Sequence, residues 1–210
     1  MLWNGWRGAS GKIYLSSGPA AARRRVRYGS VRAAQLLGAA KCALAVAPIG
    51  LAARGQAHLA TVGVGYDGTP EAGEALPIAG SLARPAGARL RVRAVLHDRL
   101  PYIGWAAFAR AERDAVQQLW DELIKPQAKS LREDTERVAS ASGAEAVVDV
   151  MVGTPSDGLI ALSREVDLLV IGSRRWGPAG RALLGHTGEM LMHKGYCPMM
   201  VVPRPPRRRR

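Results

Sequence analysis

The stretch Leu168–Pro203, which reads LLVIGSRRWGPAGRALLGHTGEMLMHKGYCPMMVVP, decides the fold of this chain. It opens with an apolar run that stops at Gly172, continues through a polar, glycine-rich loop, and reaches a helical segment near Gly185. A second apolar run, Met199–Val202, ends at Pro203. A strand that enters a helix through such a loop directs backbone N–H groups at one point, where the helix dipole favours an anion. The stretch therefore predicts strand, phosphate-binding loop, helix and strand.

Outward from this stretch, residues 59–203 alternate between apolar runs and helical patterns. Strands separated by helices form parallel βαβ units with right-handed crossovers. We therefore expect an α/β fold: an open five-stranded parallel sheet with helices on both faces, a Rossmann-like α/β/α sandwich. The predicted strands are Ala60–Tyr66, Leu90–Leu96, Ala146–Val152, Asp167–Ile171 and Met199–Val202.

Three turns follow predicted strands and are candidates for a ligand site. Asp67, Gly153 and Gly172 each come directly after an apolar run. Ligands of open parallel sheets bind beyond the carboxyl ends of the strands, so the three turns are expected to converge. Each also has a purely structural explanation, because Asp-Gly is a common turn and glycine allows tight packing.

Proline and threonine set the expected helix boundaries. Thr69 can cap a helix whose first position is Pro70, and Pro77 is expected to kink that helix. A long helical pattern covers Ala106–Ala141, and Pro126 is expected to interrupt it.

The net charge of +13 is concentrated in two clusters. Residues 23–27 hold four arginines and residues 204–210 hold five. The rest of the chain is only mildly basic and has no recognition-helix pattern, so no specific nucleic-acid binding is expected. Residues 204–210 are predicted to be a basic, disordered tail.

Cysteine content and hydropathy point to a cytoplasmic protein without a membrane span. Two cysteines do not make a disulfide framework, and the N-terminus lacks the apolar core of a signal peptide. The stretch Leu36–Ala53 is rich in Ala and Gly, and it contains Lys41 and Pro48, which argues against a membrane helix.

Two parts of the chain resemble each other, either as an internal repeat or through a chance similarity of two helix–strand segments. Residues 18–48 and 177–203 share the order Gly-Pro, basic stretch, Gly, helix, Cys, apolar run and Pro. Cys42 precedes Pro48 by the same six residues that separate Cys197 from Pro203. The first copy lacks the strands needed to bury a core.

Residues 59–203 resemble a universal stress protein domain. The residues that carry the resemblance are VGYDGTPEAGEAL at the first strand end, the spacing of Gly172 and Gly185, and the closing CPMMVVPR. The chain is thereby similar to a tandem universal stress protein whose first domain survives only in residues 1–58, as a C-terminal remnant with a linker. The resemblance implies the α/β/α sandwich expected above.

The resemblance also implies a site for an adenine nucleotide. It assigns Asp67 to the adenosine part, the backbone of Val95 to adenine, and Gly172 and Gly185 to the ribose and phosphates. The complete set of nucleotide-binding candidates is Asp67, Gly68, Thr69, Val95, Gly153, Gly172, Arg175, Gly185, His186 and Thr187.

Two positions depart from the family's nucleotide motif. Arg175 stands where the second glycine belongs, and such a side chain either blocks the loop or pairs with a phosphate. His186 replaces the hydroxyl residue, although Thr187 is next to it.

The functional expectation is an ATP-binding regulatory module in the stress response, with or without Mg²⁺, and not a fast enzyme. The alternatives are a nucleotide-free, dimerising scaffold of the same fold and a slow ATP hydrolase. No catalytic set of Ser, His and Asp, and no recurring metal-ligand spacing among His97, His186 and His193, can be assembled.

Pairing through the last strand is the final expectation. Because domains of the family pair there, the resemblance implies a homodimer or an intramolecular equivalent. We expect Ala43–Ala47 to lie antiparallel beside Met199–Val202, with Cys42 close to Cys197.

Overall fold

The computed structural model describes residues 42–49, 51, 58–97, 120–173 and 184–203. Arg175, the N-terminal part of the predicted long helix and the basic tail therefore lie outside the described residues. The strands are β1 (Leu44–Val46), β2 (Thr61–Tyr66), β3 (Arg89–His97), β4 (Ala146–Gly153), β5 (Leu168–Gly172) and β6 (Met199–Val202). The helices are α2 (Pro70–Ala86), α5 (Lys125–Ser140), α6 (Pro155–Leu162) and α7 (His186–Lys194), and a π-helical turn, η2 (Trp120–Ile124), precedes α5.

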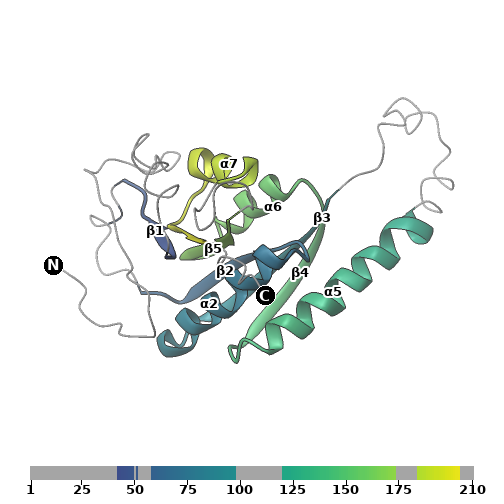
Figure 1. The fold of residues 1–210 in the computed structure, drawn as a ribbon, viewed down its shortest axis with the longest axis horizontal. Coiled ribbons are helices and arrows are strands. Elements are labelled where there is room, and N and C mark those ends of the chain that lie inside the picture. Colours follow the sequence, from purple (N-terminus) through teal and green to yellow (C-terminus); the bar gives the residue numbers. More distant parts are fainter. Residues whose placement is uncertain (1–41, 50, 52–57, 98–119, 174–183, 204–210) are drawn as a thin grey trace, which may run out of the picture.

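The strands form one sheet in the order β1-β6-β5-β2-β3-β4 (Figure 1). The five strands from β6 to β4 are parallel, which confirms the predicted fold class. The sixth, β1, is antiparallel to β6. The parallel part of the sheet starts in the middle at β2, builds outward through β3 and β4, and then returns to add β5 and β6 on the other side. The order therefore reverses between β2 and β5, where ligands of such sheets bind.

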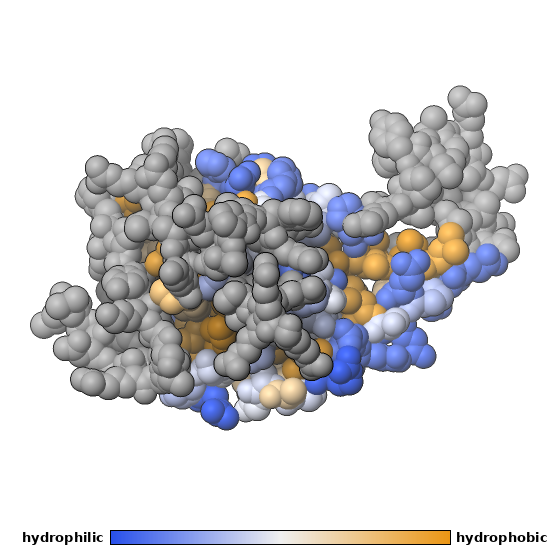
Figure 2. Space-filling view, in the orientation of Figure 1, coloured by the Kyte–Doolittle hydropathy of each residue, from blue (hydrophilic) through white to orange (hydrophobic). Residues whose placement is uncertain are grey.

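Alternate residues of each strand supply two separate cores, one for each pair of helices. Val62, Val64 and Val92 point to the side covered by α2 and α5, together with Leu76 and Ala139 of those helices. Leu169, Ile171, Met199 and Val201 pack on the other side, against Leu159 and Leu162 of α6 and Leu191 of α7. Figure 1 shows the two helix layers on opposite faces of the sheet. The outer surface of α5 is mostly hydrophilic (Figure 2), as expected for a helix with one buried side.

Helices α2 and α6 begin in the same way. Thr69 and Thr154 are the caps, and each side chain accepts a hydrogen bond from a backbone N–H of the first turn. A proline follows each threonine, where its missing N–H costs nothing. Gly87 ends α2 with φ of 61°, a left-handed conformation that favours glycine.

Helix α2 continues through Pro77, as expected from the sequence. Proline removes one helical hydrogen bond. The buried side of the helix, which includes Ala75, Leu76 and Ala79, is fully covered by the sheet and offsets that loss. Pro126 does mark a boundary, since it lies in the first turn of α5 directly after the π-helical turn.

The antiparallel pairing expected for the N-terminal strand is present. Leu44 lies opposite Val201, Ala45 opposite Met200, and Val46 opposite Met199. The expected closeness of the two cysteines is wrong, because antiparallel strands run past each other. Extending the register places Cys42 and Cys197 at opposite ends of the ladder, several residues apart.

Within the described residues, no helix has both the length and the apolar content that a membrane crossing requires.

Candidate functional site

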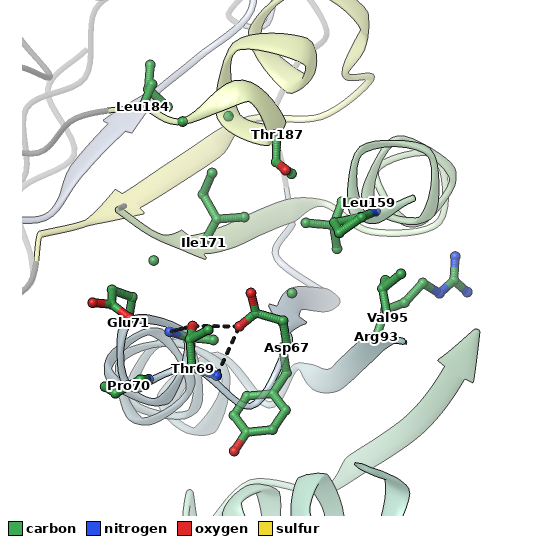
Figure 3. Close-up of a pocket in the computed structure, with 17 residues that line it drawn as sticks. Asp67, Thr69, Pro70, Glu71, Arg93, Val95, Leu159, Ile171, Leu184 and Thr187 are labelled. Atoms are coloured by element: carbon green, nitrogen blue, oxygen red, sulfur yellow. Dashed lines mark hydrogen bonds between the residues drawn. The ribbon is translucent and has the colours of Figure 1, made fainter. Parts of the chain in front are cut away.

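A pocket of about 370 Å³ lies at the carboxyl edge of the sheet, at the reversal of strand order. The turn after β2, the end of β3, the start of α6, the end of β5 and the start of α7 surround it (Figure 3). Its volume falls in the range of small-molecule sites. It is lined by Gly65, Tyr66, Asp67, Thr69, Pro70, Glu71, Ala72, Arg93, Val95, Pro155, Leu159, Ile171, Gly172, Leu184, Gly185, Thr187 and Gly188.

Asp67 shapes the turn that opens the pocket. Its Oδ1 accepts hydrogen bonds from the Thr69 backbone N–H at 3.1 Å and from Thr69 Oγ1 at 2.6 Å. Gly68 between them has φ of 75°, which suits glycine. Figure 3 shows the second carboxylate oxygen of Asp67 directed toward the space below Thr187. The residue therefore acts as a turn-former and also presents an acceptor to the pocket.

The residue before Asp67 is anchored on the opposite side of the sheet. Tyr66 Oη donates a hydrogen bond to Asp134 Oδ2 of α5 at 2.7 Å. Burial, reinforced by this bond, raises the pKa of Tyr66 to about 12. The same bond, together with Arg137, lowers the pKa of Asp134. The end of β2 is thus fixed to α5, and the Asp67 turn takes its position from that attachment.

Helix α7 presents backbone N–H groups to the pocket. Its cap, Gly185, makes no side-chain hydrogen bond, unlike the threonine caps of α2 and α6. Within α7 the first N–H to bond back to the cap carbonyl is that of Glu189. The N–H groups of His186, Thr187 and Gly188 precede it, in the turn where a helix lacks internal acceptors. Such a helix start is suited to an anion.

Gly172 permits a close contact between β5 and the first turn of α2. A Cβ built on Gly172 would lie 2.2 Å from the Glu71 carbonyl oxygen and 2.6 Å from its carbon. Backbone atoms on both sides leave no room for a side chain. This contact joins two walls of the pocket, so glycine is required here for packing whether or not a ligand binds.

Arg93 is a charged lining residue that the sequence analysis missed. It is 8% exposed, and its Nε and Nη2 donate to Asp149 Oδ2 at 2.9 and 2.6 Å. Glu165 lies 3.6 Å from Nη2 and also pairs with Arg91 at 2.6 Å. Figure 3 shows the guanidinium directed away from Asp67. The alternation of arginine with apolar residues along β3 was the available signal, because a charged residue on a buried strand requires partners.

The structure brings part of the predicted set together. Six of the ten candidates line the pocket: Asp67, Thr69, Val95, Gly172, Gly185 and Thr187. Gly68 lies in the Asp67 turn, Gly153 ends β4 with φ of 148°, and His186 is the first residue of α7. Arg175 lies outside the described residues. Among the described residues, no group of three or more His, Cys, Asp or Glu side chains could hold a metal ion.

The fold and the position of the pocket define a class: doubly wound α/β proteins with a pocket at the switch point of the sheet. The chain belongs to the universal stress protein family, since that family's model matches residues 59–203.

Similar curated proteins and a similar solved structure carry the same family name. The chain is 24% identical over 144 residues to one from Thermus aquaticus, covering 68% of this chain and 97% of that protein. It is 31% identical over 155 residues to one from Mycobacterium tuberculosis, covering 69% of this chain but 48% of that longer protein. The chain thus spans about half the length of the mycobacterial relative. A solved Archaeoglobus fulgidus protein aligns with a TM-score of 0.60 and 20% identity, covering 91% of this chain and 62% of that one.

Proposed function

We propose that this chain is an adenine-nucleotide-binding regulatory module, with ATP as the ligand, and not a fast enzyme. The observation that carries the proposal is the start of α7, which lacks a side-chain cap and lies across the same pocket from Asp67. A polyphosphate would accept hydrogen bonds from the N–H groups of that turn.

Asp67 and Val95 would hold the nucleoside end of the ligand. Asp67 offers a carboxylate oxygen for a ribose hydroxyl. Val95 is the last residue of β3 that lines the pocket, and its backbone would contact the adenine. The family resemblance supports both assignments. Asp67 and Glu71 are the carboxylates of the described lining, so any Mg²⁺ would arrive with the phosphates, which supply its remaining oxygen ligands.

Regulation is a better match to this lining than rapid catalysis. The described lining contains no histidine, cysteine or lysine, and one of the two carboxylate oxygens of Asp67, Oδ1, is engaged in its own turn. Binding would order the pocket walls and change what the protein associates with in the stress response. A cytoplasmic location is part of this proposal, and cell fractionation tests it.

Calorimetry with ATP and MgCl₂ tests nucleotide binding, and a pair of variants at position 186 tests the helix start. His186→Pro removes one backbone N–H at the first helical position, where proline is tolerated. His186→Ala keeps the N–H and is the matched control. Loss of a charge-assisted hydrogen bond of about 1.5 kcal/mol predicts roughly tenfold weaker ATP binding for His186→Pro, whereas His186→Ala should bind ATP as the unmodified chain does. Absence of heat in the unmodified chain, or equal weakening by both variants, contradicts the proposal.

A second candidate is a nucleotide-free scaffold of the same fold. Gly172 and Asp67 favour the scaffold function, because both have structural roles without a ligand. Gly172 lets the α2 backbone pack closely against β5, and Asp67 stabilises its own turn by a hydrogen bond. The same calorimetry distinguishes the two functions. Phosphate release from ATP tests the slow hydrolase.

A further inference from the structure

Arg93 is a buried charge at the pocket to which the proposed function assigns no role. It lines the pocket from β3, two residues before Val95, and its side chain is 9% exposed. A buried charge requires partners, and Asp149, directly opposite on β4, accepts from Nε and Nη2 at 2.9 and 2.6 Å. The guanidinium is therefore held in one orientation before any ligand binds.

This guanidinium has more donors than the structure gives it acceptors. An arginine has five N–H groups, and three have an acceptor: Nε–H and one Nη2–H bond to Asp149, and one Nη1–H bonds to the Gly158 carbonyl at 3.4 Å. Glu165 Oε1 lies 3.6 Å from Nη2, which is too far for a hydrogen bond. Among the described residues, one N–H on each terminal nitrogen thus has no acceptor within hydrogen-bond distance. A buried donor without an acceptor costs free energy that a suitable ligand atom would recover.

The position of Arg93 decides which part of a nucleotide meets these donors. Figure 3 shows Asp67 and the Arg93 guanidinium on opposite sides of Val95. When Asp67 holds the ribose and Val95 the adenine, the edge of the base remote from the ribose faces Arg93. A guanidinium has no acceptor, so it cannot bond to the amino group of adenine and must face a ring nitrogen.

The charge balance favours a base over a phosphate at this position. Asp149 contacts Nη2 at 2.6 Å and Glu165 adds a second carboxylate, so the positive charge of Arg93 is already matched. A phosphate there would lie beside both carboxylates, and like charges repel. A neutral ring nitrogen meets no such repulsion.

We propose that Arg93 recognises the base of the nucleotide by donating a hydrogen bond to one ring nitrogen of adenine. This inference rests on the proposed function, which places the adenine at Val95. Asp149 is then a positioning residue, because it holds the guanidinium in the orientation that the base requires. The bond loses little side-chain entropy, since the donor is fixed in advance.

The test pairs a change in the protein with a change of one ligand atom. The analogues 1-deaza-, 3-deaza- and 7-deaza-ATP each replace one ring nitrogen of adenine with C–H, and Arg93→Met keeps an unbranched stem without N–H groups. Calorimetry with MgCl₂ measures ATP and the analogues against both chains. One analogue should bind the unmodified chain about tenfold more weakly than ATP does, because a hydrogen bond to a charged donor is lost. Arg93→Met should bind that analogue and ATP equally.

Arg91→Met is the matched control. Arg91 lies on the same face of β3 and also pairs with Glu165, but it is 34% exposed and is not part of the described lining. This variant should keep the discrimination between ATP and the analogue.

The outcomes separate this inference from the proposed function. ATP binding without discrimination against any analogue overturns the inference alone. Equal weakening of ATP and all analogues by Arg93→Met, with the discrimination kept, assigns Arg93 a purely structural role and also overturns it. A chain that binds none of the nucleotides overturns the proposed function and this inference with it.

Discussion

The substitution Gly172→Ala tests whether this glycine serves packing. The added Cβ would lie 2.2 Å from the Glu71 carbonyl oxygen, roughly 1 Å inside van der Waals contact. Both partners are backbone, so β5 and the first turn of α2 must separate. Overpacking of this kind costs about 2–3 kcal/mol, which lowers the melting temperature by about 5–10 °C for a chain of this length.

The matched control is Gly73→Ala, in α2, the helix that Gly172 contacts. A Cβ there meets no atom within 4 Å, so the variant should gain about 0.5–1 kcal/mol from helix propensity. Thermal unfolding followed by circular dichroism measures both variants, and calorimetry measures ATP binding. If Gly172→Ala keeps the melting temperature of the unmodified chain but no longer binds ATP, the packing argument is refuted. The glycine would then be needed for contact with the ligand.

Three further outcomes follow from the charged and titratable groups. Asp149→Asn should cost about 1–2 kcal/mol in urea unfolding, because it weakens the main partner of buried Arg93; a cost below about 0.3 kcal/mol would contradict this. Burial and its hydrogen bond raise the pKa of Tyr66 to about 12, so its stabilising contribution is complete below pH 10 and is lost as the pH approaches 12. The stability advantage over Tyr66→Phe should therefore shrink across that window, and a constant difference would count against it. Cys197, whose pKa burial raises to about 12, should react with iodoacetamide at pH 8 more slowly than partly exposed Cys42 does; equal rates would contradict its burial.

The sheet could be predicted from the sequence because its strands are nearly continuous apolar runs. The run at Met199–Val202 has the predicted bounds, and each end of the other four parallel strands lies within one residue of its predicted position. Parallel strands that are buried on both faces are nearly continuous apolar runs, so such runs indicate this kind of strand. The helix starts were equally readable, since Thr-Pro fixes both the cap and the first dihedral angle.

Features that depend on tertiary contacts could not be predicted in the same way. Arg93 lines the pocket because Asp149 of the neighbouring strand and Glu165 beyond α6 neutralise it. The separation of the two cysteines follows from the register of an antiparallel pair, which the repeat alone does not specify.

The attachment of Tyr66 to α5 has a consequence for signalling through the domain. Successive residues of a strand point to opposite faces, so one peptide unit joins the phenol held by Asp134 to the carboxylate that borders the pocket. A ligand that displaces Asp67 would therefore also shift Tyr66, and the hydrogen bond to Asp134 would transmit this displacement to α5. Amide hydrogen exchange along α5 should then report occupancy of the pocket at the carboxyl edge of the sheet.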